Sequence, residues 1–414
     1  MHARGKAAGL MKIGVFLGAA PHDGGIYQYN QAMLEAVAAL PRDCFSVVAA
    51  CASERWVAEA SALGVTPLRV EILNGEVLAG QAWRAAGLPM GAWRAINPWF
   101  HTLSKALCRE ACDLWIFPSQ DRWSYQIPVS ALGVVHDLMH RYEHRFPEIG
   151  SPLEVRRRDY HYSQTCRWAK GVLVDSPIGK EQLCESYRIA PEAVHVLPFI
   201  APKYMHAPEP PSDFDARYRL PERFIFYPAQ FWEHKNHKGL IRAVHRLKDR
   251  LPDLKLVLAG SKKNGYESTS RLVRELALED RVIFLGYVPD ADMPQIYRRA
   301  RAMVMPTFCG PTNIPPLEAF VVGCPVALSG VYGMPEQVGD CALLFDPNSV
   351  EAMAEVIDRL WTDESLNREL SRRGRQHAQA WNQAHFNVRL REILELVLGK
   401  SLKRTILPLA GAQE

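Results

Sequence analysis

The sequence predicts an α/β protein built from two doubly wound, Rossmann-like domains that face each other across a cleft. In both halves of the chain, short apolar segments bounded by glycine and proline alternate with longer segments of helical periodicity, the pattern of parallel sheets with crossover helices. The 414 residues are enough for two or three domains with cores of their own. Residues 200–221 shift to proline, aspartate and other charged residues, which indicates a linker between the halves.

Composition excludes several classes of protein. A net charge of +4 permits an anionic substrate or a membrane surface, but no aromatic-and-basic motif indicates nucleic-acid binding. No run of eighteen apolar residues predicts a membrane-spanning helix. The nine cysteines form no Cys-x-x-Cys pair, so we expect no zinc site and a reduced, cytoplasmic setting. Residues 1–11 have no apolar core like that of a signal peptide and are expected to be an N-terminal extension.

The N-terminal domain is predicted over residues 12–205. Its first strand, residues 12–17, leads through a loop to a helix over residues 25–40. Gly24 and Gly25 at the end of this loop allow backbone amides to approach a phosphate closely, although glycine turns before helices are common without any ligand. Further strands are predicted at 45–50, 66–70, 113–117, 131–135, 171–176 and 194–198.

Residues 82–112 have helical tendency and carry several large aromatic side chains. Trp83, Trp93, Trp99 and Phe100 at such spacings favour a buried core. The alternative is an amphipathic face that touches lipid, with Arg84, Arg94 and Lys105 nearby.

The strand at 131–135 ends in His136 and Asp137, which places both at the carboxyl edge of the sheet. Such a pair is either structural or part of a site. The next segment, residues 138–148, contains arginines and histidines among aromatic residues. It reads either as a mobile loop over an acceptor site, suited to a phosphate-bearing acceptor, or as a solvated basic loop.

The C-terminal domain is predicted over residues 223–384, after a linker at 206–222 and before a final helix and tail at 385–414. Its strands are predicted at 224–227, 254–260, 282–286, 302–305, 325–329 and 343–345. The fourth of these strands is followed by a loop rich in turn formers and by a helix that begins at Pro315 or Pro316 and ends at Gly323. Free amides at a helix start favour an anion, and Glu318 in the first turn can accept hydrogen bonds from sugar or ribose hydroxyls. The alternative is that Glu318 only interacts favourably with its own helix dipole.

The stretch from residue 303 to 329 resembles the donor-site signature of the retaining GT-B glycosyltransferases of glycosyltransferase family 4. That signature has two glutamates eight positions apart. Leu317-Glu318-Ala319, Pro316 and Gly323-Cys324-Pro325-Val326 match it. The first glutamate does not, because position 310 is glycine, and Gly310-Pro311-Thr312-Asn313 stands where the family usually has Glu-Gly-Phe-Gly.

The resemblance implies a role for each candidate residue. Glu318 would hold the ribose hydroxyls, while Thr312, Asn313, Ile314 and the loop amides from Gly310 would contact the sugar and phosphates. Lys235 fits the family's diphosphate-binding lysine, but the arginine position five residues earlier is Gln230. Tyr287 and Val288 match the segment along the nucleotide base. Trp381 and Phe386 lie where the family's last helix crosses back to the first domain, so the resemblance implies such a crossover helix here. In the N-terminal half, Gly24 and Gly25 would face the donor, and His136, followed by Asp137, would contact the donor sugar beside the reacting carbon.

The implied activity is a retaining, metal-independent hexosyltransferase with no cofactor. It would move a hexose, with mannose from GDP-mannose favoured, to a polysaccharide or lipid-linked glycan such as lipopolysaccharide. The expected partners are a nucleotide-diphosphate sugar and a glycan or lipid-linked acceptor, without nucleic acid, and a peripheral contact with the inner membrane face is a further expectation. Two alternatives stay open: a non-catalytic, nucleotide-sugar-binding subunit of a glycan assembly complex, and a sugar-nucleotide epimerase of the same architecture.

Overall fold

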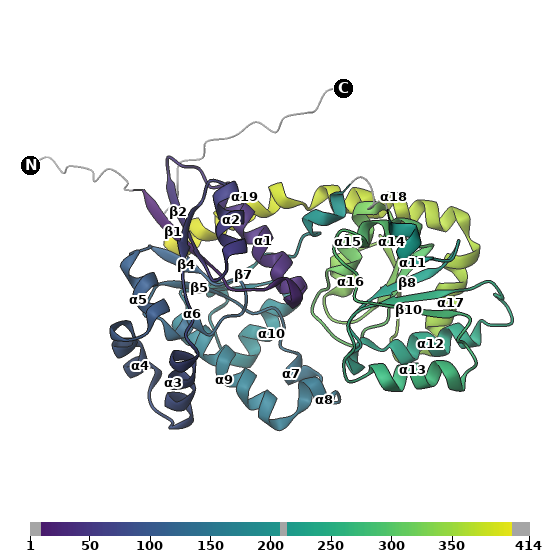
Figure 1. Ribbon diagram of the computed structural model, residues 1–414, viewed down its shortest axis with the longest axis horizontal. Helices are drawn as coiled ribbons and strands as arrows, with labels where there is room; N and C mark the ends of the chain where they lie inside the picture. The colour runs from purple at the N-terminus through teal and green to yellow at the C-terminus, as the bar shows by residue number, and fades with distance from the viewer. Residues whose placement is uncertain (1–9, 208–212, 400–414) are drawn as a thin grey trace, which may run out of the picture.

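The computed structural model describes residues 10–207 and 213–399. Two parallel sheets lie side by side, each with helices on both faces (Figure 1). The first has seven strands in the order β3-β2-β1-β4-β5-β6-β7, and the second has six in the order β10-β9-β8-β11-β12-β13. The predicted fold class, two doubly wound Rossmann-like domains, is therefore confirmed.

The strands occur where the apolar segments predicted them. In the N-terminal domain they are β1 (Met11–Leu17), β2 (Phe45–Cys51), β3 (Thr66–Arg69), β4 (Leu114–Ile116), β5 (Ala131–Val134), β6 (Gly171–Val174) and β7 (Val194–Val196). In the C-terminal domain they are β8 (Ile225–Pro228), β9 (Leu256–Ala259), β10 (Val282–Gly286), β11 (Ala302–Met305), β12 (Val326–Ser329) and β13 (Ala342–Phe345).

Helices cover both faces of each sheet. Those of the N-terminal domain are α1 (Gly25–Ala38), α2 (Glu54–Ala62), α3 (Asn74–Ala85), α4 (Met90–Ile96), α5 (Thr102–Arg109), α6 (Trp123–Gln126), α7 (Met139–Tyr142), α8 (Pro147–Gly150), α9 (Pro152–Trp168) and α10 (Pro177–Tyr187). The C-terminal half contains α11 (Phe214–Tyr218), α12 (His237–Arg246), α13 (Tyr266–Glu275), α14 (Met293–Arg299), α15 (Pro315–Val322), α16 (Met334–Val338), α17 (Val350–Thr362), α18 (Glu364–Ala380) and α19 (Gln383–Leu398).

The strand order reverses direction at one point in each sheet. These points lie between β1 and β4 and between β8 and β11, because each sheet grows outward on both sides of its first strand. Ligands of open α/β sheets bind outside the carboxyl ends of the strands at such switch points. The loops after β1, β8 and β11 are therefore the expected walls of a site.

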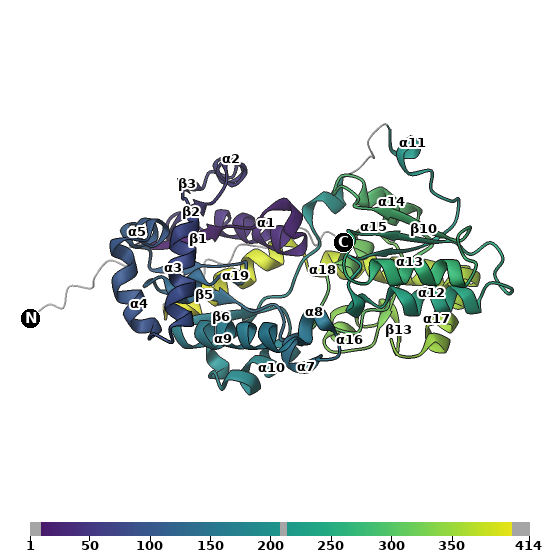
Figure 2. The same ribbon diagram turned by 60° about the horizontal axis from the view of Figure 1, so that its bottom comes forward.

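The helix α19 returns to the first domain, as the resemblance implied. Figures 1 and 2 show it lying against the N-terminal sheet, while α18 lies on the C-terminal domain. Phe386, Leu390, Ile393 and Leu394 of α19 are fully buried in the N-terminal core. In addition, the Trp381 indole donates a hydrogen bond to the backbone oxygen of Phe199 at 3.0 Å.

Parts of the predicted extension, linker and tail fall at residues 1–9, 208–212 and 400–414, outside the described residues. Of the rest of the linker predicted at 206–222, Phe214 and Leu220 pack into the C-terminal core.

The segment at 82–112 departs from the prediction of a buried aromatic helix. It is divided among α3, α4, a 3-10 turn (η2, Asn97–Trp99) and α5, and of its four large aromatic residues only Trp93 is buried. Trp99 is 84% exposed and Phe100 is 50% exposed, so the prediction that these two belong to the core is wrong. Arg94 turns inward instead, donating to the backbone oxygen of Tyr125 at 2.7 Å.

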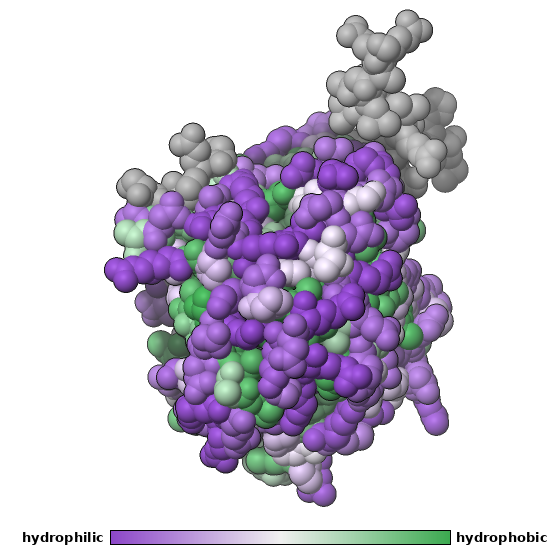
Figure 3. Space-filling model, turned by 90° about the vertical axis from the view of Figure 1, so that its right-hand side faces the viewer, coloured by the Kyte–Doolittle hydropathy of each residue, from purple (hydrophilic) through white to green (hydrophobic). Residues whose placement is uncertain are grey.

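The surface of the C-terminal domain, at the other end of the molecule from residues 82–112, has few large apolar groups. Seen from the C-terminal domain, it is mostly hydrophilic, with apolar residues in small separate groups (Figure 3). No helix in the described part of the chain is long and apolar enough to cross a membrane.

Candidate active site

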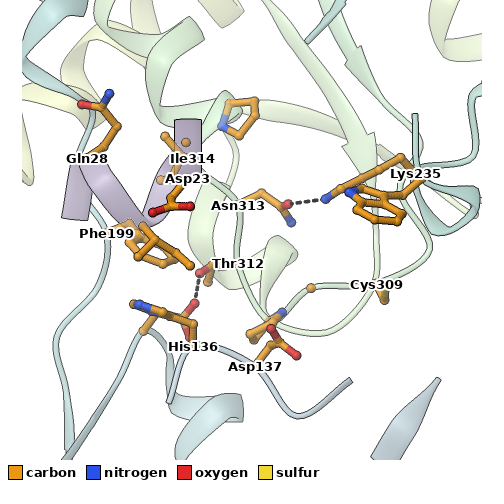
Figure 4. A pocket seen from close by; sticks show the side chains of 18 of the residues that line it. Asp23, Gln28, His136, Asp137, Phe199, Lys235, Cys309, Thr312, Asn313 and Ile314 are labelled. Atoms are coloured by element: carbon orange, nitrogen blue, oxygen red, sulfur yellow. Dashed lines mark hydrogen bonds between the residues drawn. The ribbon is translucent and has the colours of Figure 1, made fainter. Parts of the chain in front are cut away.

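A cavity of about 650 Å³ lies between the two domains, where the loops after β1, β5, β8 and β11 meet. Ten of the residues predicted from the sequence line it: Gly24, Gly25, His136, Asp137, Lys235, Gly310, Thr312, Asn313, Ile314 and Glu318. Figure 4 labels six of them: His136, Asp137, Lys235, Thr312, Asn313 and Ile314. The structure therefore brings together, in one cavity, residues that lie up to 294 positions apart in the chain, from position 24 to position 318. Such a volume is within the range of pockets that hold small molecules and cofactors.

Three predicted residues lie outside this lining. Gln230 is exposed, and its side-chain oxygen accepts a hydrogen bond from the Trp232 indole at 2.9 Å. Trp232 lines the cavity, whereas Gln230 does not. Tyr287 is 67% exposed, and Val288 is buried in the C-terminal core.

Lys235 ends a 3-10 turn (η5, Glu233–Lys235) that follows β8. Its ammonium group donates to the Asn313 side-chain oxygen at 3.4 Å, and burial lowers the pKa of Lys235. The neighbouring Asn236 fixes this turn to the loop after β11, because its amide donates to the backbone oxygen of Pro306 at 3.0 Å. The position of Lys235 thus depends on contacts between two strand ends of one sheet.

Glu318 lies in the first turn of α15, where Pro315 suits the first helical position and Gly323 (φ 74°) ends the helix. Glu318 is 6% exposed, and its carboxyl group accepts hydrogen bonds from the hydroxyls of Tyr297, at 2.6 Å, and Tyr204. Burial raises the pKa of Glu318. Each carboxylate oxygen has a second lone pair, so the group can still accept hydrogen bonds from a ligand.

The loop after β11 has a backbone that only glycine adopts readily at position 310. Gly310 has φ of 120°, and a Cβ there would lie 3.0 Å from the Asn313 amide nitrogen. Glycine at position 310, where the resembled signature has its first glutamate, therefore suits this loop conformation. Gln337 holds Asn313 from the other side, accepting from its backbone nitrogen at 3.0 Å and donating to its backbone oxygen at 2.7 Å.

His136 is half-buried at the carboxyl end of β5. Its ring stacks on Phe199 with centroids 5.2 Å apart and meets Tyr29 edge-on at 4.9 Å. Burial lowers the pKa of His136 to about 4, so the ring is neutral at pH 7. Since its Nε2 faces the backbone oxygen of Pro118 at 3.3 Å, Nε2 carries the proton and Nδ1 is an acceptor.

Thr312 connects the two domains across the cavity. Its hydroxyl donates to Oδ2 of Asp175 at 2.6 Å, and burial raises the pKa of Asp175 to about 7 (Figure 4). Asp175 follows β6 as Asp137 follows β5, so the same carboxyl-edge rule could have identified it from the sequence.

Residues 138–148 form more than a surface loop. They include α7, lead into α8, and contact the C-terminal domain, where Tyr332 donates to Glu143 at 2.7 Å. Both arginines of this segment have carboxylate partners. Arg141, in α7, pairs with Asp159 at 2.6 Å, and Arg145, after α7, pairs with Glu143 at 3.0 Å.

Several lining or supporting residues were missed by sequence reasoning, namely Gln28, Gln120, Glu148, Arg158, Asp175, Tyr204, Trp232, His234, Asp290, Tyr297 and Gln337. Tyr204 and Tyr297 reach Glu318 from 114 and 21 residues away, and no local sequence pattern signals such contacts. Among the described residues, no group of three or more His, Cys, Asp or Glu side chains is placed to hold a metal ion.

Comparison with known proteins identifies the C-terminal half most clearly. Residues 212–377 match the family model described as Glycosyl transferases group 1. O-antigen chain mannosyltransferase B of Escherichia coli is 28% identical over 244 residues, which is 57% of this chain and 63% of that protein. Mannosylfructose-phosphate synthase of Agrobacterium fabrum is 27% identical over 254 residues, 57% of this chain and 55% of that protein. The chain therefore spans less than two thirds of the length of these curated relatives.

Solved structures share the fold over nearly the whole chain. Anabaena HepE in complex with UDP and glucose has a TM-score of 0.69 and 18% identity, and the match covers 93% of this chain and 99% of HepE. Sucrose-phosphate synthase from Thermosynechococcus elongatus has a TM-score of 0.68 and 19% identity, with 94% and 99% covered. At such identities the likeness establishes the GT-B arrangement of two Rossmann-like domains and nothing finer.

Proposed function

We propose that the protein is a retaining glycosyltransferase that moves a hexose from a nucleotide-diphosphate sugar to a glycan. The observation that carries this proposal is that Lys235, after β8, and Glu318, in the first turn of α15, line one cavity together with His136 of the facing domain. A carboxylate for ribose hydroxyls and an ammonium for a diphosphate are the two groups that a sugar nucleotide requires. The group 1 match over the domain that holds both residues supports this assignment.

Each residue then has a defined task in the transfer. Glu318 binds the ribose, and Tyr204 and Tyr297 orient its carboxylate. Lys235 stabilises the charge that develops on the leaving diphosphate, and the partial burial of its ammonium group, which lowers its pKa, strengthens that interaction. His136, neutral and an acceptor at Nδ1, binds a donor-sugar hydroxyl. We propose that the acceptor oxygen bonds to the anomeric carbon on the face from which the diphosphate leaves, while the leaving phosphate takes the proton of the acceptor hydroxyl, so no protein base is needed. Lys235 supplies the positive charge at the diphosphate, and the proposal includes no metal ion.

For the donor we propose GDP-mannose. The support is the likeness to O-antigen chain mannosyltransferase B and to serotype-specific mannosyltransferase WbdA of Escherichia coli, which is 30% identical over 157 residues. On the same basis the acceptor is a polysaccharide or a lipid-linked glycan of the lipopolysaccharide kind. A peripheral membrane contact through the exposed Trp99 and Phe100 suits such an acceptor, because aromatic side chains favour the membrane interface.

A non-catalytic, nucleotide-sugar-binding subunit is the second candidate. It is favoured by the two family side chains that this chain lacks, at Gln230 and Gly310. An epimerase of the same architecture would differ from both candidates because it would convert the nucleotide sugar with no acceptor present.

Thermal unfolding with a panel of nucleotide sugars tests the proposal. Only a ligand of the native state raises the melting temperature, and we expect GDP-mannose to give the largest rise. The stabilising sugar nucleotide is then incubated with and without glycan acceptors. Transfer to an acceptor supports the glycosyltransferase, and conversion of the sugar nucleotide without an acceptor supports the epimerase. Binding with neither transfer nor slow hydrolysis of the donor supports the non-catalytic subunit. No stabilisation by any nucleotide sugar would contradict all three.

A further inference from the structure

A second cavity, of about 560 Å³, opens in the N-terminal domain beside the first. It lies outside the carboxyl ends of β4 and β5, next to the switch point between β1 and β4. The two cavities share four lining residues: Ile26, Gln120, Asp137 and Arg158. A molecule held in the second cavity therefore borders the region where His136 lies.

Four arginines from three separate parts of the chain line this second cavity: Arg84 of α3, Arg122 before α6, and Arg157 and Arg158 of α9. Two of them share one carboxylate, since Glu154 accepts from Arg157 at 2.6 Å and from Arg158 at 2.8 Å, and Arg158 also pairs with Asp137 at 3.8 Å. Arg84 and Arg122 form no ion pair with any carboxylate in the described ranges; Arg84 instead lies over the ring of Tyr160, 5.6 Å from its centroid.

Neighbouring titratable groups leave this positive charge in place. Burial and the charges of Arg122, Arg157 and Arg84 lower the pKa of His161 to about 4, so the imidazole is neutral at pH 7. Burial raises the pKa of Asp121 to about 7, and its Oδ2 is buried without a hydrogen-bond partner in the described part of the chain. The cavity thus has an excess of positive charge.

The loop that carries Arg122 is held in an unusual conformation. Gln120 has φ of 55°, in the left-handed region that a side chain other than glycine seldom adopts. Its side-chain oxygen accepts from the backbone nitrogen of His136 at 2.9 Å. Strained residues of this kind persist where the surrounding structure fixes them, frequently at functional sites. Gln120 therefore fixes the arginine loop relative to the end of β5.

We infer that this arginine-lined cavity binds a phosphate or diphosphate group of the acceptor, with Arg84 and Arg122 as the residues that recognise it. The inference rests on the proposed function, because it defines the acceptor of that transfer. A planar guanidinium group can donate two parallel hydrogen bonds to the oxygens of one phosphate, and Arg84 and Arg122 are partly buried cations without a carboxylate partner among the described residues. The shared border at Gln120 and Asp137 lets the sugar next to that phosphate present its hydroxyl in the interdomain cavity.

Binding measurements on the full chain test this without requiring transfer. The donor cavity is first saturated with the nucleoside diphosphate that best stabilises the protein, and an α-glycosyl phosphate or the methyl α-glycoside of the same sugar is titrated by calorimetry. We expect the phosphate to bind at least about 10-fold more tightly than the glycoside, and Arg84→Gln or Arg122→Gln each to remove about 10-fold or more of that affinity. Arg122→Lys should keep part of it, and Arg156→Gln, on the exposed side of α9, should change nothing.

Three outcomes would overturn the inference: equal affinity for phosphate and glycoside, wild-type affinity in both glutamine variants, or a glucuronate that binds as tightly as the phosphate. Vesicles carrying a diphosphate-linked lipid sugar form a parallel arm that distinguishes a membrane-borne phosphate from a free one. A failure of the proposed function would be seen in a different measurement, because that function predicts thermal stabilisation by a nucleotide sugar. Arg84→Gln and Arg122→Gln should leave this stabilisation intact. If no nucleoside diphosphate binds, the glycosyl phosphate titration is run alone and still reports on the arginines.

Discussion

Lys235 reaches the interdomain cavity from the loop after β8, and Asn313 receives its hydrogen bond at 3.4 Å. Lys235→Ala should lower kcat/KM by about 10- to 150-fold, because a hydrogen bond to a charged group in the transition state is lost. Steady-state kinetics with the donor that stabilises the protein measure the effect. Lys238→Ala is the matched control, since Lys238 pairs with Glu233 at 2.6 Å and lies outside the cavity. Equal rates for Lys235→Ala and wild type would remove Lys235 from the site.

Asp175 gives the stability of the protein a pH dependence of defined sign. Its native pKa is about 7, whereas an unfolded aspartate has a pKa of about 3.9. Between these values the native state holds a proton that the unfolded state has released, so this group lowers the free energy of unfolding as the pH rises from about 4 to about 7.

Asp175→Asn removes that penalty. The variant should be more stable than wild type at pH 8, by on the order of 2–4 kcal/mol, and the gain should disappear towards about pH 4. Urea denaturation across this range measures it. Asp346→Asn is the control, because hydrogen bonds from Asn348 lower the pKa of that exposed carboxyl, and no gain at pH 8 is expected. A difference between Asp175→Asn and wild type that is independent of pH would contradict the assignment.

Several residues that line the cavity could be predicted from the sequence, because they follow the carboxyl ends of parallel strands. His136, Lys235, Thr312 and Asn313 follow buried strands directly or within a short loop, and carboxyl ends of parallel strands meet at one edge. Tyr204 escaped prediction because its hydrogen bond to Glu318 joins segments 114 residues apart. The sequence also did not show that Arg84 and Arg122 have no carboxylate partner among the described residues, since such pairing depends on the folded structure.

Among the structural elements, the loop after β11 depends on one backbone conformation. Gly310→Ala should lower the melting temperature and weaken donor binding, because a side chain at φ of 120° costs about 1–3 kcal/mol and its Cβ would press on Asn313. Thermal unfolding with and without the donor measures both effects. Gly75→Ala in α3 is the control, as a Cβ there meets no atom within 4 Å. If Gly310→Ala matched wild type in both measurements, the loop would not depend on glycine.

The α4–η2 segment supplies a test of membrane contact. Replacing Trp99 and Phe100 together by serine should reduce sedimentation with vesicles rich in anionic lipid, since both side chains are at least half exposed and aromatic groups favour the interface. Leu153→Ser, which changes a 79% exposed apolar residue on α9, should bind as wild type does. Undiminished binding by the double variant would place any membrane contact elsewhere.

Strands were easier to predict than this helical segment. A strand buried on both faces is a continuous apolar run, as in β11, and its limits are visible in the sequence. The helical segment at 82–112 has aromatic residues at intervals that fit a buried face, yet some of them face solvent. Periodicity identifies an apolar face but not what covers it.

At the scale of the whole molecule, the end of the chain completes the core of its beginning. Gln383 of α19 donates to the backbone oxygen of Ala32 in α1 at 3.0 Å, and Ile393 is fully buried between α19 and the N-terminal sheet. The second domain is therefore linked to the first at both of its ends, by the segment before β8 and by the passage from α18 to α19. This arrangement limits how far the domains can separate around the cavity between them.

Ile393→Ala should destabilise the N-terminal domain by about 2–5 kcal/mol, although residue 393 follows the whole C-terminal domain in the sequence. Hydrogen exchange monitored by mass spectrometry resolves the two domains: amides of α1 and β1 should lose protection, while those of β8 and β11 keep it. Val388→Ala changes a 59% exposed side chain of the same helix and should stay within about 0.5 kcal/mol of wild type. Protection lost equally in both domains would mean that they unfold as one unit, and protection lost only in the C-terminal domain would contradict the assignment of α19 to the first core.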